Sequence, residues 1–243
     1  GDWARQLTAR GHAGPSGRAV PAGWCRLAGD IQRRGSTTAT AQGDGHRPRR
    51  NSVREERSPG AFRPSFPLVE AKLIRPEPHP GIVSRGRLLR LFTAEPAAAA
   101  VLVVAPPGYG KTVLLADWAA QEQRDVAWLT LGEFDNDPSV FLTYVAAAID
   151  RVEPIDPSFG GALTAQGTRI LAEAVPRLAS ELHRWRRPGV LVLDDVHRLE
   201  DRTCLDALAS LLDHLPPGFR VVMASRTTPD LPVGRLRANR ALL

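Results

Sequence analysis

An apolar run that ends in a glycine-rich bend, and is followed at once by a helical pattern, constrains the fold of this chain more than any other feature. Residues 100–105, Ala-Val-Leu-Val-Val-Ala, are typical of a strand buried on both faces, and residues 111–121 have the apolar periodicity of a helix. The bend at residues 106–112, Pro-Pro-Gly-Tyr-Gly-Lys-Thr, joins the two. A strand, a loop with this ending and a helix, in that order, are typical of a phosphate-binding loop.

The side chains and backbone of this bend suit a polyphosphate. Gly108 and Gly110 can adopt a positive φ and turn successive backbone N–H groups inward, and the following helix adds its unpaired N-terminal N–H groups. Lys111 can reach the β- and γ-phosphates, and the Thr112 hydroxyl can bind Mg²⁺. The alternative is a Gly/Pro turn with an exposed lysine, since Ala105 stands where the general pattern has a glycine. We expect the phosphates of ATP to be bound by Pro107, Gly108, Tyr109, Gly110, Lys111 and Thr112.

Strand and helix patterns alternate through the sequence that follows. Further strands are predicted at residues 125–131, 190–193 and 219–224, and further helices at residues 139–151, 171–185 and 205–215. Pro176 should kink the second of these helices or mark its first turn. The alternation predicts parallel strand–helix–strand units with right-handed crossovers. The expected fold class is therefore α/β, a three-layer P-loop NTPase sandwich with a mainly parallel sheet.

Two acidic residues end the third predicted strand. Asp194 should emerge beside Thr112, because doubly wound sheets bind ligands at the carboxyl ends of their strands. We assign Asp194 to Mg²⁺, through water, and Asp195 to orienting the water that attacks the γ-phosphate. The alternative for Asp195 is an N-cap of the next helix. His197 could relay a proton or donate a hydrogen bond, although a lone histidine after a strand is more often structural.

Arg226 follows the fourth predicted strand and points toward the same edge of the sheet. It could sense the γ-phosphate and stabilise the charge of the transition state, so we assign it a catalytic role; the alternative is a salt bridge to surface acids. Residues 133–138, Glu-Phe-Asp-Asn-Asp-Pro, follow the second strand on the same side. Their expected role is to cap the helix that starts near Pro138.

Positive charge is concentrated at the beginning of the chain. Residues 1–66 hold 12 Arg and 5 acidic side chains, whereas residues 67–243 hold 20 basic and 21 acidic side chains. Because the first segment has scattered Gly, Pro and Ser without any periodicity, we predict that it is a disordered, solvated tail. Loose phosphate binding by its arginines is the alternative. We divide the chain into this tail, a lead-in segment at residues 67–99 and an incomplete P-loop ATPase domain at residues 100–243.

Apolar runs and cysteine spacing exclude several classes of protein. The longest apolar run, residues 97–105, is nine residues long, too short for a membrane span, and the first residues carry no secretory signal. Cys25 and Cys204 lie too far apart for a zinc site or a disulfide framework. We therefore expect a cytoplasmic location without membrane contact. Because Met223 is the single methionine and Leu243 ends an apolar, helix-prone stretch, we hypothesise a fragment whose first 60 or so residues could be non-native.

The order of several short motifs carries a family resemblance. They lie at residues 72–73, 80–83 with 85, 87–89, 105–112, 135–138 with 141 and 144, 193–197, 224–226 with 229, 231–232 and 235–237. Together they resemble the signal-transduction (STAND-type) ATPases of large ATP-binding LuxR-family transcriptional regulators, the group that includes the maltose-operon activator. The resemblance covers about residues 68–243, and an alanine at the head of the phosphate loop is usual in this family.

The resemblance implies several properties beyond those argued from the residues. Val83 and Arg85 would lie near the adenine or ribose of ATP. The family works as a switch in which ATP and an inducer favour a self-associating, DNA-binding form, and hydrolysis to ADP resets it. Binding to DNA would reside in a C-terminal helix-turn-helix domain absent from this chain.

Our interpretation is an ATP-binding, slowly hydrolysing switch domain of a transcriptional regulator. One alternative is an AAA+-like ring ATPase, for which Arg235, Arg237 or Arg240 would supply an arginine to a neighbouring subunit. Another is a module that binds the nucleotide without hydrolysing it. A small-molecule kinase is less favoured, because the sequence has no arginine-rich lid between the third and fourth strands.

Overall fold

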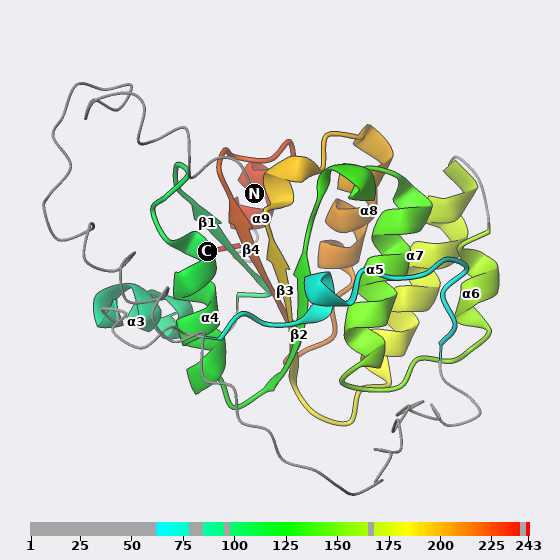
Figure 1. The fold of residues 1–243 in the computed structure, drawn as a ribbon, viewed down its shortest axis with the longest axis horizontal. Helices are drawn as coiled ribbons and strands as arrows, with labels where there is room; N and C mark the ends of the chain where they lie inside the picture. Colours follow the sequence, from blue (N-terminus) through cyan, green and yellow to red (C-terminus); the bar gives the residue numbers. More distant parts are fainter. Residues whose placement is uncertain (1–61, 78–84, 95–97, 165–167, 239–241) are drawn as a thin grey trace, which may run out of the picture. The chain divides into compact units, whose positions relative to one another are not determined.

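A computed structural model describes the folded part of the chain, at residues 62–77, 85–94, 98–164, 168–238 and 242–243. All of these residues belong to one compact unit, residues 55–243. Its centre is a four-stranded parallel sheet with the order β1-β4-β3-β2 (Figure 1). The strands are β1 (Ala100–Val104), β2 (Asp125–Thr130), β3 (Gly189–Asp194) and β4 (Arg220–Ser225). The predicted parallel sheet is confirmed.

Helices cover both faces of the sheet, which makes the fold a three-layer sandwich. α3 (Gly86–Ala94) and α4 (Lys111–Gln121) lie on one face, and α5 (Pro138–Asp150), α7 (Thr168–His183) and α8 (Arg202–Asp213) lie on the other (Figure 1). The shorter elements are α6 (Phe159–Ala162), α9 (Val233–Ala238) and the 3₁₀ turns η1 (Glu70–Leu73), η2 (Glu133–Asp135) and η3 (Val196–Arg198). Among the described residues, no helix is long and apolar enough to cross a membrane.

Strand β3 explains why the sequence shows a continuous apolar run here instead of alternation. All six of its residues are buried. Val190 and Val192 belong to the core cluster beneath α3 and α4, whereas Leu191 and Leu193 belong to the cluster beneath α5, α7 and α8. Because successive side chains point to opposite faces, a strand covered on both sides must be apolar at every position.

Helix α5 begins where the capping residues predict, whereas Pro176 differs from its prediction. Asp137 caps α5 by accepting hydrogen bonds from the backbone N–H groups of Ser139 and Val140, and Pro138 occupies the first turn. Pro176 lies in the interior of α7, which begins at Thr168, so the prediction that it marks a first turn is wrong. Its side chain is exposed on the helix surface.

The folded part begins earlier than the predicted boundary at residue 66. The Phe62 side chain is 1% exposed and packs against Phe159, with ring centroids 5.9 Å apart. Phe66 contacts Tyr144, whose hydroxyl accepts a hydrogen bond from the Val69 N–H group at 3.1 Å. Two aromatic side chains are too few to produce a periodic pattern, so sequence composition alone assigned them to the tail. The rest of the predicted tail, residues 1–61, lies outside the described residues.

The last two residues pair with the sheet rather than continuing a helix. The Leu102 N–H group donates to the Leu243 carbonyl at 3.0 Å, and the Leu243 N–H group donates to the Ala100 carbonyl at 3.0 Å. The helix of this region, α9, ends at Ala238. The expectation of a helix up to Leu243 is therefore wrong, because a short apolar run fits a strand at the edge of β1 equally well.

Candidate nucleotide-binding site

The loop between β1 and α4 has the backbone that its glycines predict. Gly108 and Gly110 have φ values of 81° and 74°, in the left-handed region. The Lys111 side chain is 8% exposed, and its ammonium group donates hydrogen bonds to the carbonyls of Ala105 at 2.8 Å and Pro106 at 3.2 Å. The loop therefore wraps around the lysine, and the exposed lysine of the alternative interpretation is not found.

A threonine at the start of α4 and an aspartate at the end of β3 meet beside this loop. The Thr112 hydroxyl, in the first turn of α4, donates a hydrogen bond to the Asp194 carboxylate at 2.6 Å. Asp194 ends β3 and is 1% exposed. Burial raises the pKa of Asp194, and the nearby Asp195 carboxylate raises it further; the hydrogen bonds from Thr112 and from the Asp195 N–H group, together with the Lys111 charge, act in the opposite direction.

Asp195 has a backbone conformation that aspartate adopts only at a cost. Its φ of 59° makes it the one non-glycine residue with a positive φ in the described part of the chain. Its N–H group donates to the Asp194 carboxylate at 2.9 Å, and its own side chain forms no capping hydrogen bond. The residue that caps α8 is Asp201, which accepts from the Cys204 N–H group. The alternative role of Asp195 as the cap of that helix is therefore not found.

His197 is close to the charged groups of this edge, although the sequence favoured a structural role for it. Both ring nitrogens are buried, and neither has a hydrogen-bond partner among the described residues. Burial lowers the pKa of His197, as do the charges of Arg226, Arg198 and Lys111, while Asp195 opposes them. A lowered pKa favours the neutral form of the ring, and Nδ1 lies 3.7 Å from the Asp195 carboxylate. A buried histidine with two unpaired nitrogens is unusual for a purely structural residue.

Two arginines were expected near this site, and only one of them contacts the phosphate loop. The Arg85 guanidinium donates to the Tyr109 carbonyl at 2.7 Å, so it contacts the loop itself. Arg226 follows β4, is exposed and forms no ion pair with any described residue, so the salt bridge of the alternative interpretation is not found there. Val83, expected near the adenine, lies outside the described residues.

An apolar cavity of about 420 Å³ opens beside the phosphate loop. Arg85, Leu88 and Tyr109 line it together with Leu114 and the residues of β1. It adjoins Lys111, so one continuous surface passes from the loop into an apolar hollow. Such a combination suits a ligand with a charged end and a flat apolar end.

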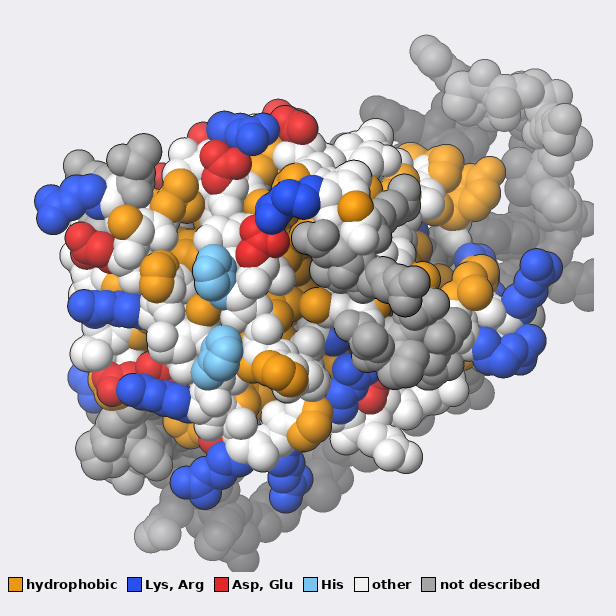
Figure 2. All heavy atoms as spheres, turned by 180° about the vertical axis from the view of Figure 1, so that it is seen from behind, with side chains coloured by type: hydrophobic (Ala, Val, Ile, Leu, Met, Phe, Trp, Pro, Cys, Tyr) orange, Lys and Arg blue, Asp and Glu red, His pale blue; other side chains and the backbone are white. Residues whose placement is uncertain are grey.

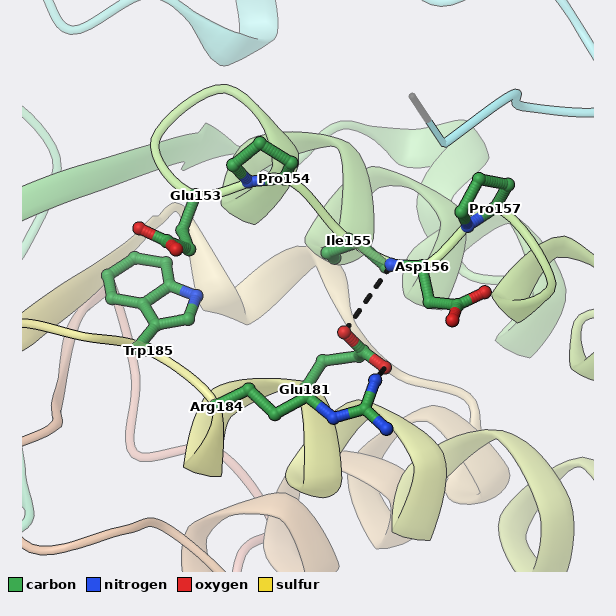
Figure 3. A pocket seen from close by; sticks show the side chains of 8 residues that line it. All are labelled: Glu153, Pro154, Ile155, Asp156, Pro157, Glu181, Arg184 and Trp185. Carbon is green, nitrogen blue, oxygen red and sulfur yellow. Dashed lines mark hydrogen bonds and ion pairs between the residues drawn. The ribbon is translucent and has the colours of Figure 1, made fainter. Parts of the chain in front are cut away.

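The cavity in Figure 3 lies at the opposite edge of the sheet. It has a volume of about 310 Å³ and is lined by Trp185, which precedes β3, and by residues around Glu181. The Glu181 carboxylate accepts hydrogen bonds from Arg184 at 2.9 Å and from the Asp156 N–H group at 3.4 Å (Figure 3). Within this cavity Glu181 pairs with Arg184, and none of the residues predicted for the site lies there.

The β2–α5 connection contains contacts that the sequence did not predict. Asp135 is fully buried and binds the Lys72 ammonium through both carboxylate oxygens, at 2.6 and 2.8 Å. The side-chain carbonyl of Asn136 accepts hydrogen bonds from the backbone N–H groups of Glu200 and Asp201. The run of polar residues at 133–138 was the available signal, but it indicated only a helix cap.

A known protein family matches the part of the chain that contains this site. The AAA ATPase domain family matches residues 85–223, which is more than half of the chain and includes the phosphate loop, Asp194 and Asp195. The chain belongs to the AAA ATPase domain family. Acidic and basic side chains of this AAA ATPase domain are interspersed on the face seen in Figure 2.

Curated relatives of this AAA ATPase domain are transcriptional regulators. The chain is similar to the HTH-type transcriptional regulator MalT of Yersinia enterocolitica, with 36% identity over 72% of the chain, and to MalT of Klebsiella pneumoniae, with 34% identity over 72% of the chain. It spans only about 20% of the length of each of these relatives. The resemblance to regulators of this group is thereby confirmed for the domain.

Solved structures also resemble the domain. A Walker-type ATPase of Pyrococcus abyssi has 12% identity and a TM-score of 0.41, with 63% of this chain and 48% of that chain covered. The ORC1 protein of Aeropyrum pernix, solved in complex with DNA, has 18% identity and a TM-score of 0.41, with 65% of this chain and 41% of that chain covered.

Proposed function

We propose that this domain binds ATP with Mg²⁺, hydrolyses it slowly and serves as the switch of a transcriptional regulator. The observation that carries the proposal is the hydrogen bond between Thr112 and Asp194, because it joins the phosphate loop to the carboxyl end of β3. Family membership implies a nucleotide-binding domain, typically with Mg²⁺. The regulator assignment follows the MalT relatives, of which this chain spans a fifth.

The residues present suit Mg²⁺. The Thr112 hydroxyl and the Asp194 carboxylate are hard oxygen donors, which Mg²⁺ prefers, and Mg²⁺ completes its coordination with water and phosphate oxygens. A bound cation also compensates the burial of the Asp194 charge, whose pKa is raised in the domain without it. When bound, Mg²⁺ neutralises charge that develops on the phosphate oxygens.

Each part of the nucleotide has a complementary part of the site. The N–H groups of the loop and of the first turn of α4 face the phosphates, and Lys111 exchanges its carbonyl partners for phosphate oxygens. Asp195 orients the attacking water, and Arg226 stabilises negative charge on the γ-phosphate. The apolar cavity takes the base, and Arg85 holds the loop on the same side.

A switch requires two arrangements with different affinities for the nucleotide. We propose that ATP favours one arrangement, in which the longer protein self-associates, and that ADP favours the other. DNA binding and inducer sensing would reside in segments beyond the present chain. A slow reaction suits such a switch, since the lifetime of the ATP form sets the duration of the signal.

Binding and hydrolysis can be tested separately with two substitutions. Lys111→Ala should weaken ATP binding about 10- to 150-fold, because it removes charge-assisted hydrogen bonds of roughly 1.5–3 kcal/mol. Asp195→Asn should leave the Kd for ATP unchanged and slow phosphate release in single-turnover assays. Arg187→Ala, an exposed charge remote from the loop, is the matched control. Unchanged ATP affinity in Lys111→Ala refutes the proposed binding site. Full hydrolytic activity in Asp195→Asn refutes the catalytic role of Asp195. ATP binding without phosphate release in the unsubstituted protein indicates a module that binds the nucleotide without hydrolysing it.

A further inference from the structure

The segment from Asp195 to Asp201 connects β3 to α8 and is tightly turned. Its first residue has the left-handed φ of 59°, and the turn η3 follows immediately. The Arg198 N–H group donates to the Asp195 carbonyl at 2.9 Å, and the Leu199 N–H group donates to the Val196 carbonyl at 3.0 Å. A non-glycine residue keeps such a backbone only where its surroundings hold it from more than one side.

The beginning of this segment is held by the sheet. The Leu131 N–H group donates to the Asp194 carbonyl at 2.9 Å, and the Asp195 N–H group donates to the Asp194 carboxylate at 2.9 Å. These bonds restrain the backbone at Asp194 and Asp195, but they do not restrain the path of the chain toward Asp201. Val196 and Leu199 pack into the core, and the position of Asp195 depends in addition on what holds the far end of the segment.

The other end is held by the side chain of Asn136. Its carbonyl oxygen accepts hydrogen bonds from the Glu200 N–H group at 2.9 Å and the Asp201 N–H group at 2.7 Å. Asn136 comes from the β2–α5 connection, 64 residues earlier in the chain than Glu200. A second bond, between Glu133 and Arg198 at 2.8 Å, joins the same two connections but is exposed to solvent, where ion pairs contribute little.

We propose that Asn136 is a positioning residue that holds Asp195 in its left-handed conformation by fixing the far end of the Asp195–Asp201 segment. The structural part of this proposal is independent of ATP hydrolysis. Its functional part, an effect on the rate of hydrolysis, rests on the proposed function. The side-chain hydrogen bonds of Asn136 go to Glu200 and Asp201, and none joins it to the phosphate loop among the described residues, so it acts through Asp195. Without its two hydrogen bonds, the segment relaxes toward a negative φ at Asp195, and the carboxylate moves away from the place of the attacking water.

The neighbouring Asp137 provides a matched structural control. Its carboxylate also accepts two backbone hydrogen bonds, from Ser139 and Val140, but these lie in α5 and do not reach the Asp195–Asp201 segment. Asn136→Ala and Asp137→Ala therefore each remove an acceptor of two N–H groups from the same connection. Asn136→Asp keeps the acceptor oxygen and serves as the conservative variant.

Amide hydrogen exchange in the nucleotide-free chain tests the structural part. In Asn136→Ala, the Arg198 and Leu199 amides should exchange about tenfold faster or more, because the hydrogen bonds of η3 open more often. The same amides should keep their protection in Asn136→Asp and Asp137→Ala. Unchanged protection of both amides in Asn136→Ala overturns the proposal, whether or not the protein hydrolyses ATP.

Single-turnover hydrolysis at saturating ATP tests the functional part. Asn136→Ala should hydrolyse ATP about 10- to 100-fold more slowly, since a displacement of about 1 Å at a reacting group has an effect of this size, while its Kd for ATP stays unchanged. Asn136→Asp should restore the rate, and Asp137→Ala should keep it. An equal loss of rate in Asn136→Ala and Asp137→Ala overturns positioning by Asn136. Absence of hydrolysis in the unsubstituted protein contradicts the proposed hydrolysis instead, and hydrogen exchange then decides on Asn136 alone.

Discussion

Asp194 lies in surroundings that disfavour the charged form of its carboxylate. Its carboxylate is removed from water and lies next to a second carboxylate, that of Asp195, and both effects raise its pKa above the ordinary 3.8. The Thr112 hydroxyl and the Lys111 charge compensate only in part. Such a carboxylate lowers the stability of the folded domain when no cation is bound, and it provides a ligand when a cation binds.

Asp194→Asn should therefore stabilise the domain in the absence of Mg²⁺ and nucleotide. Because the pKa is raised on folding, the folded state binds more protons than the unfolded state between pH 3.8 and the folded pKa, so the carboxylate lowers stability as the pH rises through that interval. The melting temperature of Asp194→Asn should exceed that of the unsubstituted protein by a few degrees at about pH 7. Differential scanning fluorimetry should show this difference shrinking toward about pH 4. A difference independent of pH contradicts the prediction.

At the scale of elements, one ion pair holds the lead-in segment against the sheet. Lys72, in η1, binds the buried carboxylate of Asp135, in η2, and its ammonium group lies 4.5 Å from the centre of the Tyr144 ring. The Gly132 N–H group donates to the same carboxylate at 2.7 Å. The pair therefore connects the segment before α3 to the connection that carries Asn136.

Lys72→Met should destabilise the domain by about 3 kcal/mol, because it leaves the Asp135 charge buried without its partner. The double variant Lys72→Met with Asp135→Asn should recover most of this loss, since the unpaired charge is then absent. Urea unfolding followed by tryptophan fluorescence measures both. If the double variant is as unstable as the sum of the single variants, the two side chains are not coupled.

At the scale of the whole molecule, the core extends from both faces of the sheet to the segment that precedes the first described helix. Phe62 is fully buried against Phe159, far along the chain, while Phe134 in η2 is 88% exposed. The two side chains are chemically identical and differ only in how far the folded chain buries them. They form a matched pair for measuring how far the core reaches.

Phe62→Ala should cost about 3–5 kcal/mol of unfolding free energy, the usual cost of removing a buried phenylalanine ring. Phe134→Ala should change it by less than about 0.5 kcal/mol, as exposed substitutions do. Equilibrium urea denaturation of the whole chain compares the two. Equal effects would show that residues 62–66 are not part of the folded unit.

Sequence reasoning was sufficient wherever a short local pattern has a single physical solution. The loop at residues 106–112 needs glycines for its positive φ values, and the apolar run of β3 needs helices on both faces. The alternation of strands and helices along the chain predicts a parallel sheet. In a parallel sheet, Thr112 and Asp194 are expected at the same edge. Periodicity was insufficient at Leu243, since a few apolar residues fit either a helix or a strand.

The sequence by itself thus determined the α/β order, the phosphate loop and the acidic strand end, because backbone conformation and burial on two faces act through neighbouring residues. Only the tertiary structure decided the left-handed turn at Asp195, the unpaired ring of His197 and the hydrogen bonds of Asn136. These depend on side chains that lie dozens of residues apart in the chain and meet when the strands align. A polar residue in a loop has many possible partners, and packing of the whole domain selects one of them.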